Sequence, residues 1–457
     1  MSFDPALSQG LTELIELLSQ GELGPARARA EILLRRYPEQ PELWRLSGVC
    51  ALQQGEFDVA RRALDQALKL APQSVENWCN LASLHTAQRE FGEAERALRH
   101  ALTLSPHHAA ALNNLGSLLD ARGDYYGAAE CFSKAITQRP DYARAWVNQA
   151  AALLSVRQLG RAEASAQRAV QLTPHWADAH FVLGNVLDAA RKPGAVAAWR
   201  EAARLAPSNP QYQYQLGLGE DKEGRFAAAV RAFEACLALV PDHFAALSQL
   251  AFLHRRLCDW RALPPLSRHL IAGIDANAPG ITPFSMLVED TTPAQQLACA
   301  RTFAAQRELE VEPLQNRLGP RPHGRHDGPL RVGFVSAGFG QHPTALLIVE
   351  LIERLRTQAL HTIAYATTPD DGSALRKRLA AGFGEFRDLS SRALDGMLLK
   401  LREDRPDILI DLDGYCEGSR PELFALRPAR VQVNWLAYPG TLGAPWCDYL
   451  IADRFVI

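Results

Sequence analysis

The chain has 457 residues, 49 of them basic and 51 acidic, so its net charge is −2, and 47% of the residues are hydrophobic. These values are typical of a globular protein and leave no overall charge that would attract nucleic acid or an anionic membrane. The eight cysteines include no C-x-x-C pair, which argues against a zinc site and a disulfide framework and predicts reduced thiols in the cytoplasm. We expect no signal peptide and no membrane helix, because no basic segment precedes the first apolar stretch and no apolar run is long enough to span a bilayer.

Prolines recur through the first half of the chain at an almost constant interval. Each one follows an amphipathic helical pattern and precedes another, as expected where a proline ends a helix. Successive prolines are 34, 34, 34, 34, 33 and 34 residues apart, which is the period of the tetratricopeptide repeat, a pair of helices. The prolines are Pro38, Pro72, Pro106, Pro140, Pro174, Pro207 and Pro241.

Small residues keep the same phase as the prolines. Alanines recur where paired helices must approach closely, and glycines recur where the first helix of each pair must end in a left-handed residue. We therefore predict an all-α superhelix over residues 1–262, with about seven repeats whose stacking creates a groove for an extended partner. The alanines are Ala60, Ala94, Ala128, Ala162 and Ala229, and the glycines are Gly21, Gly55, Gly123 and Gly224.

Three asparagines, Asn80, Asn114 and Asn148, stand eight residues after successive prolines. Asparagine is a poor helix former, so folding alone does not ask for it inside a helix. Its amide offers both donors and an acceptor, and a row of such amides can hold a peptide backbone without reading side chains. We predict a peptide-binding ladder; the alternative is capping of neighbouring helices or surface polarity.

The repeat period stops at residues 263–328, where several prolines interrupt the pattern. We expect a helical transition there, including one amphipathic helix that begins near Thr292. From residue 329 to 457 short apolar runs alternate with helical ones, which predicts a parallel, doubly wound α/β sheet. Ligands bind such sheets at the carboxyl ends of the strands.

The first strand-to-helix junction of the α/β segment is the most informative. Strand RVGFVSA runs through Gly338 and Gly340 to His342, and a helix begins at Pro343, so that Thr344 lies where free backbone N–H groups can meet an anion. The third glycine of the dinucleotide fingerprint is missing. His342 is our candidate catalytic residue; the alternative is a polar surface or capping histidine.

Asp411 and Asp413 resemble paired carboxylates that hold a divalent ion. Side chains alternate across a strand, so one of the two should point away. We predict no metal and no cofactor.

Several blocks of sequence resemble the protein O-GlcNAc transferases of glycosyltransferase family 41, and together they cover nearly the whole chain, repeats included. The blocks are CDW at 258–260, PFSML at 283–287, HPT at 342–344, PDDGS at 369–373, RPELFALRPARVQVNWLAYPGT from Arg420 and GAPWCDYLIAD from Gly443. Animal enzymes of this family resemble VSSDFGNHPT where this chain reads VSAGFGQHPT, so the carboxylate sometimes proposed as the base is Gly338 here. Paired histidines of the animal forms are Pro283 and Phe284, which places the chain nearer to the bacterial branch.

The resemblance implies inverting transfer of N-acetylglucosamine from UDP-GlcNAc to serine or threonine, without metal, between two Rossmann-like lobes of a GT-B fold. It implies that His342 lines the site and that peptide acceptors reach it through the repeat groove. Residues expected to contact the sugar nucleotide or the acceptor are Thr344, Tyr415, Gly418, Leu436, Ala437, Tyr438 and Pro439.

The chain ends at Ile457, where the resemblance covers only the first of the two lobes. We therefore expect either a piece of a longer enzyme or a short protein that has kept the groove and lost the chemistry. Two alternatives stay open: a non-catalytic scaffold that binds peptides, and fucose transfer from GDP-fucose as in the SPINDLY branch.

Overall fold

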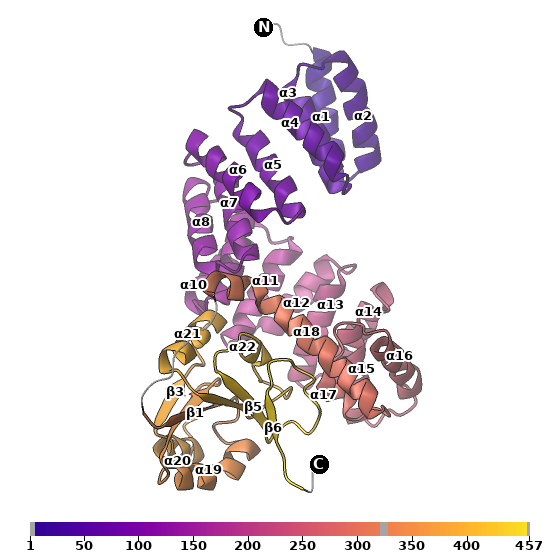
Figure 1. Ribbon diagram of the computed structural model, residues 1–457. Coiled ribbons are helices and arrows are strands. Elements are labelled where there is room, and N and C mark those ends of the chain that lie inside the picture. Colours follow the sequence, from indigo (N-terminus) through magenta and orange to yellow (C-terminus); the bar gives the residue numbers. More distant parts are fainter. Residues whose placement is uncertain (1–4, 320–327, 455–457) are drawn as a thin grey trace. The chain divides into compact units, whose positions relative to one another are not determined.

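The computed structural model describes residues 5–319 and 328–454 (Figure 1). The chain divides into two compact units, one comprising Met1–Leu154 with Gly160–Pro174, the other Ser155–Leu159 with His175–Ile457. Within the described ranges the predicted fold class is confirmed: antiparallel helix pairs precede a parallel α/β sheet.

The first unit consists of helix pairs at the predicted period. Its helices are α1 (Pro5–Gln20), α2 (Leu23–Arg36), α3 (Pro41–Gln53), α4 (Phe57–Leu70), α5 (Val75–Ala87), α6 (Phe91–Leu104), α7 (Ala109–Ala121), α8 (Tyr125–Gln138), α9 (Ala143–Ser155) and α10 (Leu159–Leu172). The five in-phase alanines, one of which lies in the second unit, are fully buried, as close helix packing requires. Three tryptophans fasten the turns, because the indole N–H of Trp44, Trp78 and Trp146 donates to the carbonyl of the proline six residues earlier at 2.7, 2.9 and 2.9 Å.

The left-handed position of each repeat is not reserved for glycine. Gly55 and Gly123 adopt φ values of 77° and 76° there, as predicted. Arg89, Arg157 and Arg191 occupy the same position in other repeats with φ values of 59°, 60° and 54°. The repeat therefore imposes the conformation, and the side chain adapts to it.

The second unit begins with the last repeats and a long connecting helix. Its helices before the sheet are α11 (Ala177–Ala189), α12 (Ala195–Leu205), α13 (Pro210–Lys222), α14 (Phe226–Leu239), α15 (Phe244–Arg256), α16 (Leu263–Asp275), α17 (Pro283–Met286) and α18 (Pro293–Leu318). Helix α18 is the amphipathic helix predicted near Thr292, and Thr292 caps it in a capping box with Gln295.

The α/β part of this unit is a six-stranded sheet in the order β3-β2-β1-β4-β5-β6, with every neighbouring pair parallel. Its elements are β1 (Leu330–Ser336), α19 (Pro343–Leu355), β2 (Leu360–Ala366), α20 (Ala374–Gly382), β3 (Glu385–Asp388), α21 (Leu394–Asp404), β4 (Ile408–Asp411), α22 (Pro421–Ala425), β5 (Val431–Trp435) and β6 (Tyr449–Ile451). Strands β1, β2 and β4 are largely apolar because helices cover both faces, whereas β5 also buries the polar Gln432 and Asn434.

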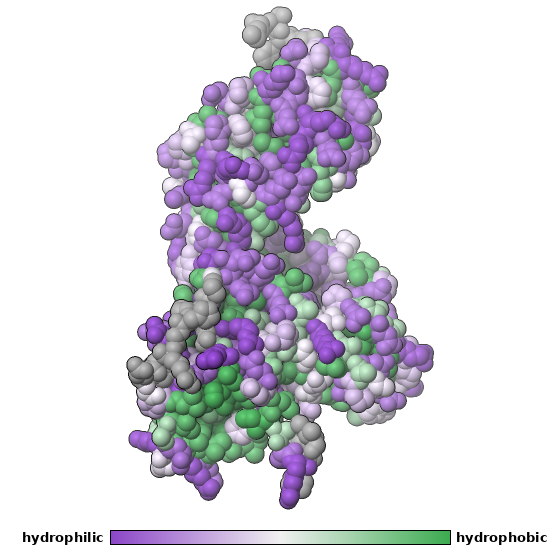
Figure 2. Space-filling view, in the orientation of Figure 1, coloured by the Kyte–Doolittle hydropathy of each residue, from purple (hydrophilic) through white to green (hydrophobic). Residues whose placement is uncertain are grey.

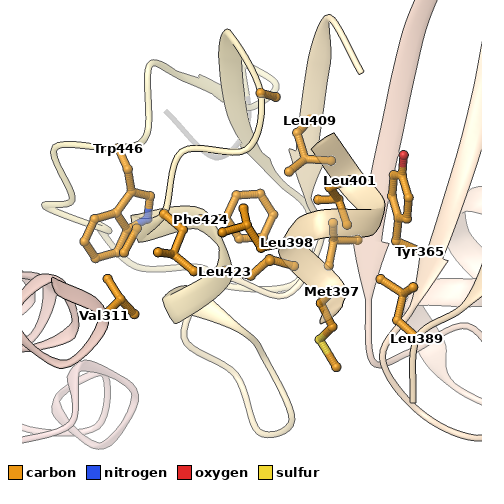
Figure 3. Packing of buried hydrophobic residues seen from close by; sticks show 14 of the residues in the cluster. Val311, Tyr365, Leu389, Met397, Leu398, Leu401, Leu409, Leu423, Phe424 and Trp446 are labelled. Carbon is orange, nitrogen blue, oxygen red and sulfur yellow. The ribbon is translucent and has the colours of Figure 1, made fainter. Parts of the chain in front are cut away.

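Two buried clusters pack against the sheet. One joins α19 and α20 to the strands through Ile348, Ile352 and Leu379. The other joins α18, α21 and α22 to the opposite face, and Figure 3 shows Val311 of α18 beside Trp446 and Leu423. Helix α18 also buries Cys299 among residues of α15 and α16, so it belongs to the core of the last repeat as well as to that of the sheet.

Candidate functional site

The carboxyl ends of β1 and β4 meet at the switch point of the sheet. The chain leaves β1 toward β2 on one side and leaves β4 toward β5 on the other, which opens a crevice where doubly wound sheets bind ligands. Three loops border it, residues 337–342 after β1, 412–420 after β4 and 436–448 after β5. Every catalytic or sugar-nucleotide residue predicted from the sequence lies in these loops or in the first turn of α19.

His342 is exposed and is the N-terminal cap of α19. Its Nδ1 accepts the backbone N–H of Thr344 at 3.2 Å. A ring nitrogen that accepts from an amide carries no proton, so the neutral imidazole holds its proton on Nε2. In this conformation His342 offers a hydrogen-bond donor through Nε2. The capping contact proposed as the alternative is present, and the catalytic role stays a prediction.

Thr344 is buried, and its N–H is the group that His342 accepts. The amide of Thr344 is therefore already engaged, contrary to the expectation that it is free to meet an anion. Its side chain lies beside Gly338, where an added Cβ would stand 3.2 Å from the Thr344 Cβ and 2.6 Å from the His342 Nδ1. Glycine at 338 lets the ring and the helix end approach the loop this closely.

Asp411 and Asp413 are both buried and both face the interior of the crevice loops. Asp411 Oδ1 accepts the N–H groups of Asp413 and Gly414, each at 3.0 Å. Asp413 accepts the Ser336 hydroxyl at 2.7 Å and the Ala337 N–H at 2.6 Å. The expectation that one of the two points away is wrong, because β4 ends at Asp411 and Asp413 already lies in the following turn.

Burial governs the ionisation of this pair. It raises the pKa of Asp411 to about 6, with the neighbouring Asp413 charge adding to the effect. Burial also raises the pKa of Asp413, while hydrogen bonds from Ala337 and Ser336 and the nearby His342 oppose the change. Among residues 5–319 and 328–454 no group of three or more potential metal-binding side chains occurs. Asp413 ties the end of β1 to the loop after β4, whereas Asp411 closes the turn after β4 and accepts from Asn434 of β5.

Tyr415 and Tyr438 are buried and do not form an exposed wall. The Tyr415 hydroxyl donates to the Leu442 carbonyl at 2.7 Å, and its ring packs edge-on against Phe303 and Tyr438, with centroids 4.8 and 5.4 Å apart. Burial raises the pKa of both phenols. Both side chains fix the loop after β5.

Gly418 and the loop after β5 complete the border. Gly418 adopts φ 80°, and a Cβ there would stand 3.1 Å from the Cβ of Ala337. Ala437 donates its N–H to the Leu412 carbonyl at 3.2 Å, and Leu436 before it has the unusual φ of 95°. Pro439 is exposed. The structure thus brings all these predicted residues to one sheet edge.

A pocket of about 630 Å³ opens between this loop and β6. Leu436, Tyr438 and Pro439 line it together with residues of β6. Figure 2 shows hydrophobic residues gathered over this part of the unit, and Tyr449 of β6 is 65% exposed. The lining combines apolar residues of this loop and of β6 with the polar Asn434, Asp448 and Asp453.

The three asparagines lie in the first unit, each half-buried. Asn148 Nδ2 donates to Asn113 Oδ1 at 3.1 Å, and Asn113 donates to Asn114 at 3.5 Å. The Nδ2 of Asn80 is buried without a hydrogen-bond partner among the described residues. Sequence reasoning missed Asn113, whose signal was the Asn-Asn pair in α7. Asn114 and Asn148 are thus linked through Asn113, whereas Asn80 has a donor without a partner among the described residues.

The segment after β2 was also missed. Its PDDGS sequence carried the family resemblance without an assigned role, yet Asp371 and Arg376 contact the loop that bears His342.

Among the described residues no helix is long and apolar enough to cross a membrane.

A superhelix of tetratricopeptide type that precedes a sheet of this order, with polar loops at its switch point, defines a repeat protein with a Rossmann-like lobe. Residues 314–456 match the profile described as glycosyl transferase family 41, and residues 11–75, 79–143 and 119–179 match the tetratricopeptide repeat. Residues 314–456 are thus similar to glycosyl transferase family 41, and the residues before them are similar to tetratricopeptide repeats.

Named relatives are similar to parts of the chain. A probable UDP-N-acetylglucosamine–peptide N-acetylglucosaminyltransferase SEC of Arabidopsis thaliana is 31% identical over 188 residues, which are 39% of this chain and 19% of that protein. The corresponding transferase of Caenorhabditis elegans is 31% identical over 208 residues, 43% of this chain and 18% of that protein. A SPINDLY protein of Hordeum vulgare is 33% identical over 131 residues, 28% and 14% of the two chains. The matched part is thus about a fifth or less of each relative.

Proposed function

We propose that the protein transfers N-acetylglucosamine from UDP-GlcNAc to serine or threonine hydroxyls of extended peptides. The observation that carries the proposal is the family 41 match over 314–456, which includes all three loops of the crevice. The names of the Arabidopsis and Caenorhabditis relatives support the donor and the peptide acceptor.

The geometry of His342 favours one of its two possible roles. A hydroxyl that attacks an anomeric carbon loses a proton, and the leaving diphosphate gains negative charge. With Nδ1 held by the Thr344 amide, the imidazole can donate through Nε2 but cannot accept a proton without breaking the cap. We therefore assign His342 to stabilising the developing charge, and the acceptor proton to an oxygen of the donor phosphate.

The first unit supplies the acceptor side of the proposal. Asn80 has a buried amide donor without a partner, and a buried donor left unpaired costs about 1–3 kcal/mol. If the half-buried Asn80 side chain turns outward, this donor can meet a peptide carbonyl without regard to the peptide's side chains. The unpaired donor does not stabilise the fold, so its presence favours peptide binding over helix capping as the role of Asn80.

The test is a transfer assay with the protein as its gene encodes it, serine- and threonine-containing peptides, and either UDP-GlcNAc or GDP-fucose. We expect transfer of N-acetylglucosamine and a loss of about 10²-fold or more in kcat for His342→Ala, with unchanged peptide affinity. Peptide binding without transfer from either donor would refute the enzyme and leave the scaffold, whereas transfer from GDP-fucose alone would refute the donor.

The pH profile separates the two roles of His342. A base would lose activity as the imidazole becomes protonated at low pH, whereas a donor works in both the neutral and the charged form. Glutamine keeps an N–H donor but cannot act as a base. We therefore expect kcat to depend on pH in the same way in the wild type and in His342→Gln. A kcat of His342→Gln no higher than that of His342→Ala would contradict the donor role.

A further inference from the structure

One neighbouring segment holds the loop that carries His342 at three alternate residues. The segment runs from Thr368 to Arg376, between β2 and the first turns of α20, and we call it the 368–376 clamp. Because every second residue of the loop is held, its backbone has little freedom to shift along the edge of the sheet. The Thr368 hydroxyl donates to the Ala337 carbonyl at 2.8 Å, the Arg376 guanidinium donates to the Phe339 carbonyl at 2.9 Å, and the Gln341 N–H donates to the Asp371 carboxylate at 2.7 Å.

Arg376 is the inner part of the clamp and is only 3% exposed. Its guanidinium pairs with Asp388 at 3.0 Å and lies over the Phe386 ring, 5.1 Å from the centroid. Its backbone N–H donates to the Ser373 hydroxyl that caps α20. A buried guanidinium held by a carboxylate, a ring and a helix end has one position, so its remaining N–H fixes the Phe339 carbonyl.

Asp371 is the outer part of the clamp and is exposed. Hydrogen bonds from the Gln341 N–H, and then from Ser373, lower its pKa to about 2, so the carboxylate is charged at neutral pH. Gly340 makes this approach possible, because a Cβ at that position would collide with the Asp371 carboxylate. The charge therefore lies directly on the peptide unit between Gly340 and Gln341.

The contact at Gln341 governs His342 through the backbone. The His342 N–H donates to the Gly340 carbonyl at 2.8 Å, which closes a tight turn around Gln341. Because the Asp371 carboxylate holds the Gln341 N–H on one side of this turn, it also fixes the backbone orientation at His342, from which the imidazole extends. The imidazole must then reach the Thr344 amide, 3.2 Å from Nδ1, to complete the cap.

We propose that Asp371 and Arg376 are positioning residues for His342, which hold loop 337–342 so that the imidazole keeps Nδ1 on the first turn of α19 and leaves Nε2 for a ligand. The proposal rests on the proposed function for its catalytic meaning. The dependence of the His342 conformation on the clamp does not rest on that function and is measured without any substrate.

The first experiment compares Asp371→Ala with Glu350→Ala. Both remove one exposed carboxylate near the histidine loop, but Glu350 lies on the outer face of α19 and interacts with Arg378 and not with the clamp. Hydrogen exchange read by mass spectrometry reports the Gln341 amide, and ¹⁵N spectra of the histidine rings, assigned with His342→Ala, report the tautomer. We expect Asp371→Ala to speed exchange across 338–345 by about tenfold or more and to mix the two tautomers of His342.

Glu350→Ala should leave both signals as in the wild type. Asp371→Asn should restore part of the protection, because its amide oxygen can still accept one N–H. Gly340→Ala should reproduce the Asp371→Ala spectra without any change of charge, since its Cβ displaces the carboxylate. Unchanged exchange at Gln341 and an unchanged tautomer in Asp371→Ala would overturn the proposal whatever the protein's activity.

A double-mutant cycle, with sugar transfer as the measured activity, tests whether the clamp affects catalysis through His342. Asp371→Ala should lower kcat by about tenfold in the wild type and have no further effect in His342→Ala, because both changes act on one group. Full additivity of the two losses would overturn the positioning role. If exchange and tautomer respond as expected but no variant and no wild type transfers sugar, the clamp stands and the proposed function falls.

Discussion

Replacing Asp411 with asparagine should stabilise the protein at neutral pH, although it removes a charge from the candidate site. The carboxyl is buried, and burial raises its pKa to about 6. An unfolded chain ionises the same group with a pKa of about 3.9, and a tenfold change in proton affinity is worth about 1.36 kcal/mol. The folded protein therefore gives up about 3 kcal/mol to hold Asp411 ionised at neutral pH, as an upper estimate.

The sign of the pH dependence follows from the direction of this change. Because the folded-state pKa lies above the unfolded value, the protonated carboxyl contributes stability that is complete below about pH 4 and is lost as the pH rises through about 6. Asparagine has no proton to lose. Its oxygen can accept the N–H groups of Asp413 and Gly414 as Asp411 Oδ1 does, and a rotated Asn434 amide can present its oxygen to the new NH₂ group.

The assay is urea denaturation of wild type and Asp411→Asn between pH 4.5 and 8, with hydrogen exchange in β4 as the local measure of unfolding. Asp290→Asn is the control, since Asp290 is exposed and belongs to the same unit. We expect the variant's gain in the free energy of unfolding to grow between pH 5 and pH 7, and the control to show no such trend. An equal or lower stability of Asp411→Asn at pH 7.5 would refute the reasoning.

Two further changes test the acceptor groove and the loop after β5. Replacing Asn80, Asn114 and Asn148 together with alanine should weaken the binding of unrelated peptides by similar factors of about a hundredfold, since each of the three lost amide bonds is worth about 1 kcal/mol; fluorescence anisotropy measures this, and a loss confined to one peptide would contradict backbone recognition. Within that set, Asn80→Ala alone should not lower the melting temperature, because its Nδ2 has no partner among the described residues, whereas Asn148→Ala loses its bond to Asn113. Tyr415→Phe removes the hydroxyl that holds the Leu442 carbonyl and should cost about 1 kcal/mol and raise the exchange of residues 438–443; unchanged exchange there would show that ring packing alone fixes the loop.

Periodicity made the helices and the sheet predictable, because both depend on where apolar residues fall. The buried alanines follow from spacing that can be counted, and the parallel sheet follows from the alternation of short apolar runs with helical ones. Tyr415 and Tyr438 could not be placed in this way, since their burial depends on Phe303 of α18, more than a hundred residues earlier. The role of Asp371 was hidden for the same reason: its partner, the Gln341 amide, belongs to another loop and leaves no mark in composition or periodicity. The domain boundaries and the catalytic role of His342 stay predictions.

Helix α18 can couple ligand binding at the last repeats to ligand binding at the crevice. Its residues take part in three environments in turn: Cys299 packs with α15 and α16, Phe303 packs on Tyr415 beside the crevice, and Val311 packs under the sheet. A ligand that shifts this helix when it binds to the last repeats must alter the affinity of the crevice for its own ligand. By linkage the crevice ligand would then alter the affinity of those repeats by the same factor, so acceptor and donor would each report the presence of the other.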